Sequence, residues 1–164
     1  MNGKIMIVIG SESDLPLAHI CASQLEFFNI ACSIRIASAH RTPEHAIALL
    51  NDDSAECIIA AAGLAAHLPG VLAAHTIKPV IGLPVPSGSL NGIDALLSIV
   101  QMPPGIPVAA VAIGEPGAKN AAILAAEILS LKYPALKDLL VKFRQMQKEK
   151  IIAADSRINS LPGK

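Results

Sequence analysis

Two imidazoles and a guanidinium lie close together in the sequence, at His40, Arg41 and His45. The planar guanidinium of an arginine binds a phosphate through two parallel N–H donors. The imidazole of a histidine exchanges a proton near neutral pH, which suits it to general acid–base catalysis. We therefore predict that His40 moves a proton of a substrate whose phosphate is bound by Arg41. His45 falls inside the next predicted helix and is interpreted as a surface or packing residue.

The elements on either side place His40 and Arg41 in a loop at the end of a strand. Residues 30–36 form an apolar run typical of a strand, and helical spacing begins again at residues 42–51. Thr42 supplies a hydroxyl suited to the N-cap of that helix. The loop therefore starts at the carboxyl end of a strand, which is where parallel sheets bind their ligands.

Five apolar runs rich in β-branched residues alternate with segments of helical spacing. The runs are continuously apolar rather than alternating, which is typical of a parallel sheet covered on both faces. We predict a doubly wound α/β domain, a three-layer α/β/α sandwich around a five-stranded parallel sheet. The expected strands are residues 4–9, 30–36, 57–61, 79–83 and 108–113, and the expected helices are residues 14–28, 42–51, 92–100 and 118–129.

The C-terminal part of the chain differs from the rest. We expect a single domain over residues 1–164, with its core in residues 4–130. Residues 134–152 have the spacing of an amphipathic helix, and residues 153–164 are expected to form a frayed tail. The C-terminal helix either packs on its own sheet or contacts a neighbouring subunit, and the sequence leaves both open.

The composition favours a cytoplasmic homo-oligomer that binds a small molecule. Hydrophobic residues make up 52% of the chain and charged residues 16%, so we expect apolar surface to be buried between subunits. The formal net charge is zero, which argues against nucleic acid or an anionic membrane as partner. No segment is typical of a signal peptide or a membrane-spanning helix. The three cysteines lack metal-ligand spacing and are interpreted as reduced and buried, so no metal is expected.

Polar residues also follow the first predicted strand, in the segment GSESD at residues 10–14. Ser11 and Ser13 offer hydroxyls, and the free N–H groups of a helix start favour an anion. Asp14 has two interpretations. It could cap the helix, or it could accept hydrogen bonds from a ribose while Ser11 holds a phosphate.

The third predicted strand leads into AAAGLAAHLPG, residues 60–70, a segment rich in alanine and glycine. Such residues let the backbone approach a ligand closely and line a small, dry pocket. His67 has three open interpretations, which are catalysis, the start of a helix and a subunit interface. A hydroxyl-rich segment, PSGSLNG at residues 86–92, follows the fourth strand.

Several segments together resemble the PurE family of purine biosynthesis, in the same order and with the same spacing. They are GSESD, SAHRTP, AGLAAHLPG, the long run at residues 79–108 and AIGEPGAKNA. The match runs from about residue 4 to residue 130, and SAHRTP looks like the class I mutases of bacteria. The resemblance implies a flavodoxin-like fold, a homo-octamer with sites at subunit contacts, and no cofactor.

The resemblance also implies a reaction and a set of site residues. Family members move the carboxylate of N5-carboxyaminoimidazole ribonucleotide from the exocyclic nitrogen to ring carbon C4, without metal, biotin or ATP. His40 would act as acid and then as base, with carbon dioxide trapped in the pocket between the two steps. The implied substrate-binding residues are Ser11 and Arg41 for the phosphate, Asp14 for the ribose, Ser13, Ser38 and Ala39 in the loops around them, and Ala62 and Gly63 for the base and its carboxylate.

Two other functions remain open on the sequence alone. A carboxylase that uses carbon dioxide directly on aminoimidazole ribonucleotide would share these residues, and so would a nucleotide-binding protein without turnover. The chain departs from the family pattern at Ala61 and Leu64, which replace glycines, and at Pro86, which replaces a glutamine. A leucine at a position that favours positive φ is expected either to crowd the pocket or to change the backbone.

Overall fold

The computed structural model describes residues 2–52 and 54–159, and a five-stranded parallel sheet forms its centre. The strand order is β2-β1-β3-β4-β5, which is the flavodoxin-like order and confirms the predicted fold class. Every neighbouring pair of strands is parallel. The strands are β1 (Lys4–Ile9), β2 (Ala31–Ile36), β3 (Cys57–Ala62), β4 (Val80–Pro84) and β5 (Ala109–Ala110).

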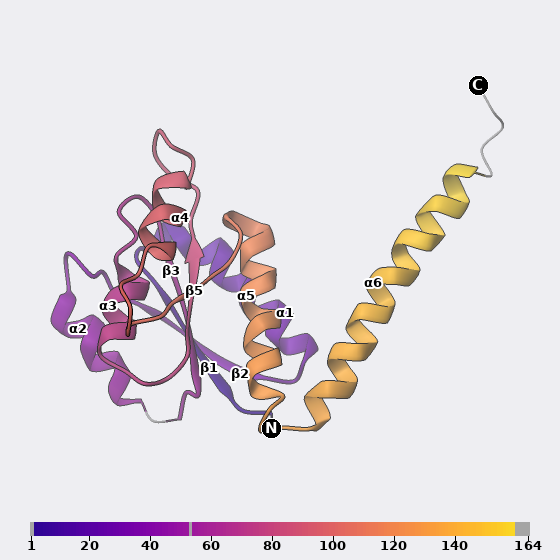
Figure 1. Ribbon diagram of the computed structural model, residues 1–164, viewed down its shortest axis with the longest axis horizontal. Helices are drawn as coiled ribbons and strands as arrows, with labels where there is room; N and C mark the ends of the chain where they lie inside the picture. The colour runs from indigo at the N-terminus through magenta and orange to yellow at the C-terminus, as the bar shows by residue number, and fades with distance from the viewer. Residues whose placement is uncertain (1, 53, 160–164) are drawn as a thin grey trace.

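Helices cover both faces of the sheet, as the three-layer prediction requires (Figure 1). Helices α1 and α5 lie on one face, and α2, α3 and α4 lie on the other. We call the sheet and these five helices the α/β core. The helical elements are η1 (Glu12–Asp14), α1 (Leu15–Phe27), α2 (Pro43–Ala48), η2 (Leu49–Asn51), α3 (Leu68–Ala74), α4 (Ile93–Val100), α5 (Gly114–Leu129) and α6 (Ala135–Asn159).

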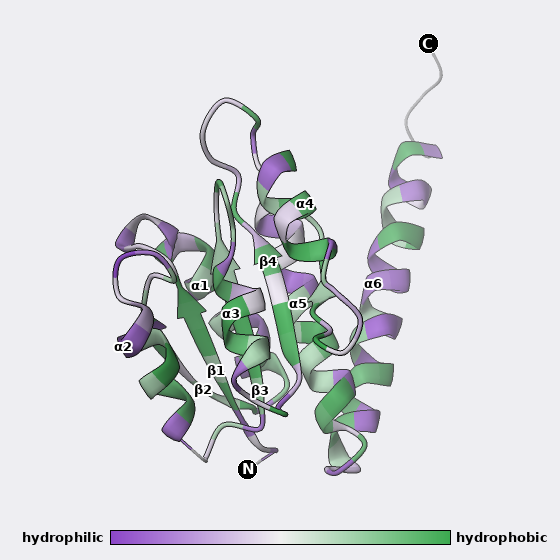
Figure 2. Cartoon of the chain, turned by 60° about the vertical axis from the view of Figure 1, so that its left-hand side comes forward, coloured by the Kyte–Doolittle hydropathy of each residue, from purple (hydrophilic) through white to green (hydrophobic). Residues whose placement is uncertain are grey.

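The central strands are buried on both faces, and this explains their continuously apolar sequences. In β1, Ile5 and Ile7 pack toward α1 and α5, whereas Met6 and Val8 pack toward the opposite helices. All four side chains are at most 1% exposed. Figure 2 shows the same strands as the most hydrophobic part of the molecule. The sheet is therefore rigidly held, and its carboxyl edge provides a fixed support for the loops.

Two helices differ from the expected ones because each begins in a segment that contains proline and glycine. Helix α5 starts at Gly114 rather than at residue 118, with Pro116 in its first turn. Helix α3, which has no counterpart among the predicted helices, has Pro69 in its first turn. A proline is tolerated there because its missing N–H would have no intrahelical partner. The predicted strand 108–113 is also shorter than expected and pairs over two residues.

Helix α6 begins against the α/β core and then leaves it (Figure 1). Leu136 and Leu140 are buried, and the ring of Phe143 packs 5.4 and 5.6 Å from the rings of Phe27 and Phe28. From residue 144 to residue 159 no residue is buried. The helix thus packs on its own core along its first turns and presents the remainder to solvent.

Helix α6 is also longer than predicted, since it ends at Asn159 instead of residue 152. The segment 153–159, expected as part of a frayed tail, contains no proline or glycine to stop the helix. Within it the Ser156 hydroxyl donates to the carbonyl of Ile152 (3.0 Å), and Asn159 donates to Asp155 (3.1 Å). The remainder of the expected tail, residues 160–164, lies outside the described residues.

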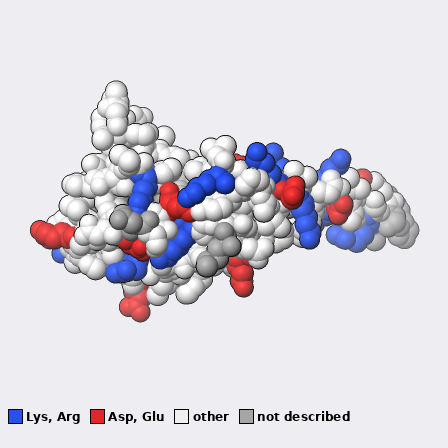
Figure 3. All heavy atoms as spheres, turned by 90° about the horizontal axis from the view of Figure 1, so that it is seen from below, with Lys and Arg blue, Asp and Glu red and all other residues white. Residues whose placement is uncertain are grey.

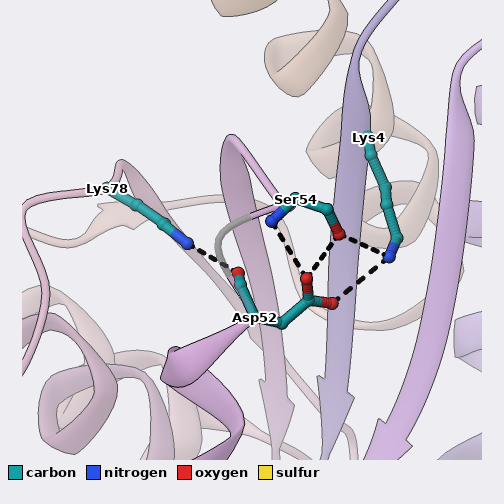
Figure 4. Close-up of polar contacts among 4 residues, drawn as sticks. All are labelled: Lys4, Asp52, Ser54 and Lys78. Atoms are coloured by element: carbon teal, nitrogen blue, oxygen red, sulfur yellow. Dashed lines mark hydrogen bonds and ion pairs between the residues drawn. The ribbon is translucent and has the colours of Figure 1, made fainter.

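The amino ends of the strands carry a cluster of charged and hydroxyl side chains (Figure 4). The Lys4 ammonium lies 3.2 Å from the Asp52 carboxylate and donates to the Ser54 hydroxyl at 2.7 Å. Ser54 donates to Asp52 through both its hydroxyl and its N–H, and Lys78 donates to the Asp52 carbonyl at 2.8 Å. The hydrogen bonds from Ser54, together with Lys4, lower the pKa of Asp52 to about 2.

A second ion pair links the amino end of β3 to the chain just before α6. The Glu56 carboxylate accepts hydrogen bonds from the Lys132 ammonium (2.6 Å) and the Tyr133 hydroxyl (2.7 Å). Burial works to raise the pKa of Glu56, but these two partners outweigh it and hold the pKa below its usual value. Viewed from this end, charges of both signs are intermixed over the core and along α6 (Figure 3).

Candidate active site

A cavity of about 540 Å³ opens at the carboxyl edge of the sheet, among the segments that follow β1, β2, β3 and β4. In flavodoxin-like sheets this edge, near the β1/β3 neighbours, is where ligands bind. All nine site residues proposed from the sequence line it together. The lining consists of Gly10, Ser11, Ser13, Asp14, Ser38, Ala39, His40, Arg41, Ala62, Gly63, Leu64, Ala65, His67, Leu68 and Ser87.

The segment after β1 forms a wall of hydroxyls around a buried carboxylate. The Ser13 hydroxyl lies 3.1 Å from the Ser11 hydroxyl and donates to the Asp14 carboxylate at 3.2 Å. The Ser11 hydroxyl accepts the Ser13 N–H, so it caps the short 3-10 turn at residues 12–14. Asp14 occupies the N-cap position of α1, but its side chain makes no capping hydrogen bond to that helix.

Asp14 is 9% exposed and lies in the wall of the cavity. Burial raises the pKa of Asp14, against the opposing effects of the Ser13 hydrogen bond and the Arg41 charge. Folding has already removed part of the water around this carboxylate. A ligand hydroxyl that binds there therefore restores a missing hydrogen bond, which makes the carboxylate a strong acceptor. Its surroundings therefore suit the binding of a diol.

The loop after β2 is closed into a tight turn that orients Arg41. The Thr42 hydroxyl accepts the N–H of Ser38 at 2.9 Å and donates to the carbonyl of Ser38 at 3.3 Å. Thr42 occupies the N-cap position of α2, as predicted, but its hydroxyl makes no capping hydrogen bond to that helix. Within the turn, Arg41 donates to the Gly10 carbonyl at 2.9 Å and to the Ser38 hydroxyl at 3.4 Å. The guanidinium is thereby directed across the loop that follows β1.

Arg41 also borders a second, adjoining cavity of about 410 Å³. Ser11 and Ser38 line both cavities, and His45 lines only the second one. His45, interpreted from the sequence as a surface or packing residue, thus lies close to the guanidinium and hydroxyls that suit an anion. His19, on α1, is absent from the lining of both cavities.

The side chains of His40 and His67 contact each other inside the larger cavity. Nε2 of His40 lies 2.8 Å from Nδ1 of His67, and the rings meet edge to face with centroids 4.9 Å apart. One nitrogen of this pair donates and the other accepts, so the protonation of either ring sets the tautomer of the other. Sequence reasoning left the role of His67 open, because the two histidines are 27 positions apart and come from different loops.

His67 immediately precedes α3, at the start of that helix. The helix-start interpretation is therefore correct for its backbone, while its ring faces the cavity and His40. The available sequence signal was its place just after β3, at the same edge of the sheet as His40.

The segment after β3 supplies an apolar wall made of backbone and small side chains. Leu64 has a φ of 54°, in the left-handed region that favours glycine. The backbone thus keeps a glycine-like conformation, and the Leu64 side chain is 55% exposed and borders the cavity. A Cβ added to Gly88 would lie 2.6 Å from Leu64, so these two residues hold the loops after β3 and β4 against each other.

The cysteines take no part in this site. Cys21 and Cys57 are buried and Cys32 is half-buried, and all three are free thiols. Burial raises the pKa of Cys21 and of Cys57 to about 12, which keeps both thiols protonated and unreactive. Among the residues that the structure describes, no group of three or more His, Cys, Asp or Glu side chains is arranged to hold a metal ion. None of the helices in the described ranges is both long and apolar enough to cross a membrane.

Comparisons with known proteins find similarity over most of the chain. The family model described as AIR carboxylase matches residues 4–150. An N5-carboxyaminoimidazole ribonucleotide mutase of Pyrococcus abyssi is 57% identical over 88% of this chain and 84% of its own length. The mutase of the same name from Methanocaldococcus jannaschii is 49% identical, over 96% of this chain and 98% of its own.

The solved structures include a close match as well. The crystal structure of Treponema denticola PurE superposes with a TM-score of 0.85 at 36% identity, covering 94% of this chain and 98% of that one. Sequence and fold thus agree over nearly the whole length, well beyond the residues that line the cavity. The chain therefore belongs to the AIR carboxylase family.

Proposed function

We propose that this protein is an N5-carboxyaminoimidazole ribonucleotide mutase of purine biosynthesis. The observation that carries the proposal is the cavity in which His40 and Arg41, adjacent in the chain, meet the hydroxyls of the β1 loop and the carboxylate of Asp14. This reaction of a ribonucleotide requires a group that binds the phosphate, a group that binds the ribose diol and a group that transfers a proton. The names of the curated relatives support the same reaction.

The phosphate and the ribose are bound at the polar end of the cavity. Arg41 and Ser11 hold the phosphate, with Ser13, Ser38 and Ala39 shaping the loops around it. Asp14 accepts hydrogen bonds from the ribose hydroxyls. Ala62 and Gly63, on the apolar wall, present their backbone to the imidazole ring and its carboxylate. Binding energy from the phosphate positions the ring beside His40.

The reaction then needs one proton donor that becomes a proton acceptor. His40 protonates the exocyclic nitrogen as its bond to the carboxylate carbon breaks, which releases carbon dioxide into the cavity. Carbon C4 of the electron-rich ring attacks that carbon dioxide and forms the new C–C bond. His40, now neutral, removes the proton from C4, and the ring becomes aromatic again. A positioned acid–base of this kind contributes roughly 10²- to 10⁴-fold to the rate.

His67 orients His40 for both steps. In the protonated form of His40, its Nε2–H donates to Nδ1 of His67, which fixes the plane of the ring. The apolar wall of Ala62, Gly63 and Leu64 keeps carbon dioxide from water while it is free.

The test is an initial-rate comparison between two substrates of the purified protein. One arm uses N5-carboxyaminoimidazole ribonucleotide, and the other uses aminoimidazole ribonucleotide with moderate bicarbonate. Efficient conversion in the first arm, with the second arm requiring very high bicarbonate, is the expected result. Preference for the second arm would make the protein a direct carboxylase, which the family description also names. Binding without product in either arm would make it a non-catalytic nucleotide-binding protein.

We also propose a cytoplasmic homo-oligomer, with an octamer as the expected assembly. Free cysteines suit a reducing compartment. The part of α6 that leaves the core carries exposed apolar side chains, including Met146, Ile151, Ile152 and Ile158. Exposed apolar patches of this kind mark interaction surfaces. Sedimentation at micromolar concentration tests the assembly, and a monomeric mass would contradict it.

A further inference from the structure

The hydroxyl of Ser87 lies buried at the edge of the cavity without a hydrogen-bond partner among the described residues. Buried hydroxyls in folded proteins are nearly always hydrogen-bonded, because burying an unpaired hydroxyl removes its hydrogen bonds to water without replacing them. Ser87 was not among the site residues proposed from the sequence. Because Ser87 also lines the cavity, a ligand bound there is placed to supply the missing hydrogen-bond partner.

The sheet itself determines where Ser87 lies. Strands β3 and β4 are neighbours with Ala62 opposite Pro84, and the N–H of Val85 donates to the Ala62 carbonyl at 2.9 Å. This pairing brings the loop after β4 directly beside the loop after β3. The Ser87 hydroxyl oxygen lies only 2.3 Å from the point where a Cβ on Gly63 would stand. Glycine at position 63 therefore leaves the space that the hydroxyl occupies.

The surroundings of Ser87 contain few other groups that could bind a polar ligand. On the wall formed by the loops after β3 and β4, the lining side chains are apolar except for His67 and Ser87. His67 already contacts His40 through Nδ1. Arg41 and Ser11 lie on the loops after β2 and β1. Ser87 thus offers an unused hydroxyl donor on the apolar side of the cavity.

We propose that Ser87 donates a hydrogen bond to the carboxylate group that the reaction transfers. This inference rests on the proposed mutase function and deepens it. With the phosphate bound at Arg41 and the ring lying along Ala62 and Gly63, the carboxylate on the ring points to the apolar wall. An anionic oxygen there needs a donor, and the Ser87 hydroxyl, which has no partner in the described part of the chain, supplies one. Ser87 forms no covalent bond and exchanges no proton with the substrate.

The test compares Ser87→Ala with a matched control, Ser33→Ala. Ser33 carries the other buried hydroxyl without a partner in the described ranges, but it lies within β2 and does not line the cavity. Calorimetry measures the affinity of each variant for 4-carboxyaminoimidazole ribonucleotide and for aminoimidazole ribonucleotide, which lacks the carboxylate. We expect Ser87→Ala to weaken binding of the first by about 10-fold or more, as for loss of a hydrogen bond to a charged group. Binding of the second should change by less than about twofold.

The control and the thermal unfolding midpoint separate binding from packing. Ser33→Ala should leave both affinities unchanged, and neither variant should unfold at a lower temperature, because each removes an unpaired hydroxyl. Equal weakening of both ribonucleotides by Ser87→Ala, or no weakening of either, would overturn the role of Ser87. If the unaltered protein binds both ribonucleotides but Ser87→Ala changes nothing, this inference alone fails. If the unaltered protein binds neither, the proposed function fails and this inference with it.

Discussion

The two ends of the same sheet are built in opposite ways. At the amino ends of the strands, the carboxylates of Asp52 and Glu56 have cationic and hydroxyl partners, and both have a lowered pKa. At the carboxyl ends, Asp14 has a raised pKa because of burial, and the Ser87 hydroxyl has no partner among the described residues. The polar groups of the amino end are satisfied by the fold itself. Those of the carboxyl end retain the capacity to bind a ligand.

This contrast indicates that polar groups at the amino end contribute to stability and those at the carboxyl end to function. Changes at the amino end should lower the free energy of unfolding and leave catalysis intact. Changes at the carboxyl end should impair catalysis or binding and leave stability the same or higher. Such a separation is the pattern expected when a binding site retains polar groups that the fold does not pair.

The largest expected effect is the loss of turnover in His40→Asn. The substitution removes the group that donates and accepts the proton while retaining a side chain able to hydrogen-bond, so kcat should fall about 10²- to 10⁴-fold. Substrate affinity should stay within about an order of magnitude, because acid–base work belongs to the transition state. Steady-state kinetics with a direct binding measurement tests both. A variant that keeps most of its rate would refute the role of His40.

The second effect, in order of size, is weaker phosphate binding in Arg41→Ala. Losing a charge-assisted, bidentate contact should raise KM by about 10- to 100-fold, and kcat should fall by a smaller factor because the phosphate also positions the ring. Arg41→Lys keeps the charge but not the planar guanidinium, so its KM should lie between that of the unaltered protein and that of Arg41→Ala. The same assay with the dephosphorylated nucleoside is the control, since that compound should not distinguish the variants. An unchanged KM for the nucleotide would contradict the assignment.

A smaller effect of the opposite kind is expected at the amino end, in Glu56→Gln. The variant loses the ion pair with the largely exposed Lys132 and should be less stable at neutral pH by at most about 1 kcal/mol, with unchanged kcat and KM. Because folding lowers the pKa of Glu56, its contribution is present above about pH 4.5 and is lost as the pH falls through the lower pKa of the folded state. Denaturant unfolding at pH 7 and below pH 4 measures this. Equal destabilisation at both pH values would mean that the ion pair is not its source.

The smallest expected effect is a slight gain of stability in Asp14→Asn. Folding raises the pKa of Asp14, so ionising it costs the folded state, and the wild-type protein loses stability as the pH rises through that raised pKa. The variant should therefore unfold at a slightly higher temperature at pH 7 and at about the same temperature below pH 3.8. Its affinity for the ribonucleotide should nevertheless fall. If the variant unfolds at a lower temperature than the wild-type protein at pH 7, Asp14 stabilises the fold, and the contrast between the two ends of the sheet does not hold.

Much of this organisation could be predicted from local sequence. The continuously apolar runs predicted the buried strands, and their ends predicted the residues of the cavity, because parallel strands all bring their carboxyl ends to one edge. Asp14 and Thr42 occupy the N-cap positions of α1 and α2, as the spacing predicts, but neither side chain makes a capping hydrogen bond. Instead, the Asp14 carboxylate accepts from Ser13 and the Thr42 hydroxyl bonds to Ser38, so each side chain stabilises a turn within its own loop. The full length of α6 was missed because a polar segment was read as a tail, although nothing in it stops a helix.

The fold class, the family and the types of side chain gathered at the sheet edge could all be predicted, because each depends on spacing along the chain. Which of those groups contact one another became clear from the three-dimensional structure alone. The contact between His40 and His67, the packing of Leu64 against Gly88 and the place of the Ser87 hydroxyl beside Gly63 all arise between loops of different strands. The physical reason is that the register of the sheet sets the distances between these loops, and no single segment contains that information.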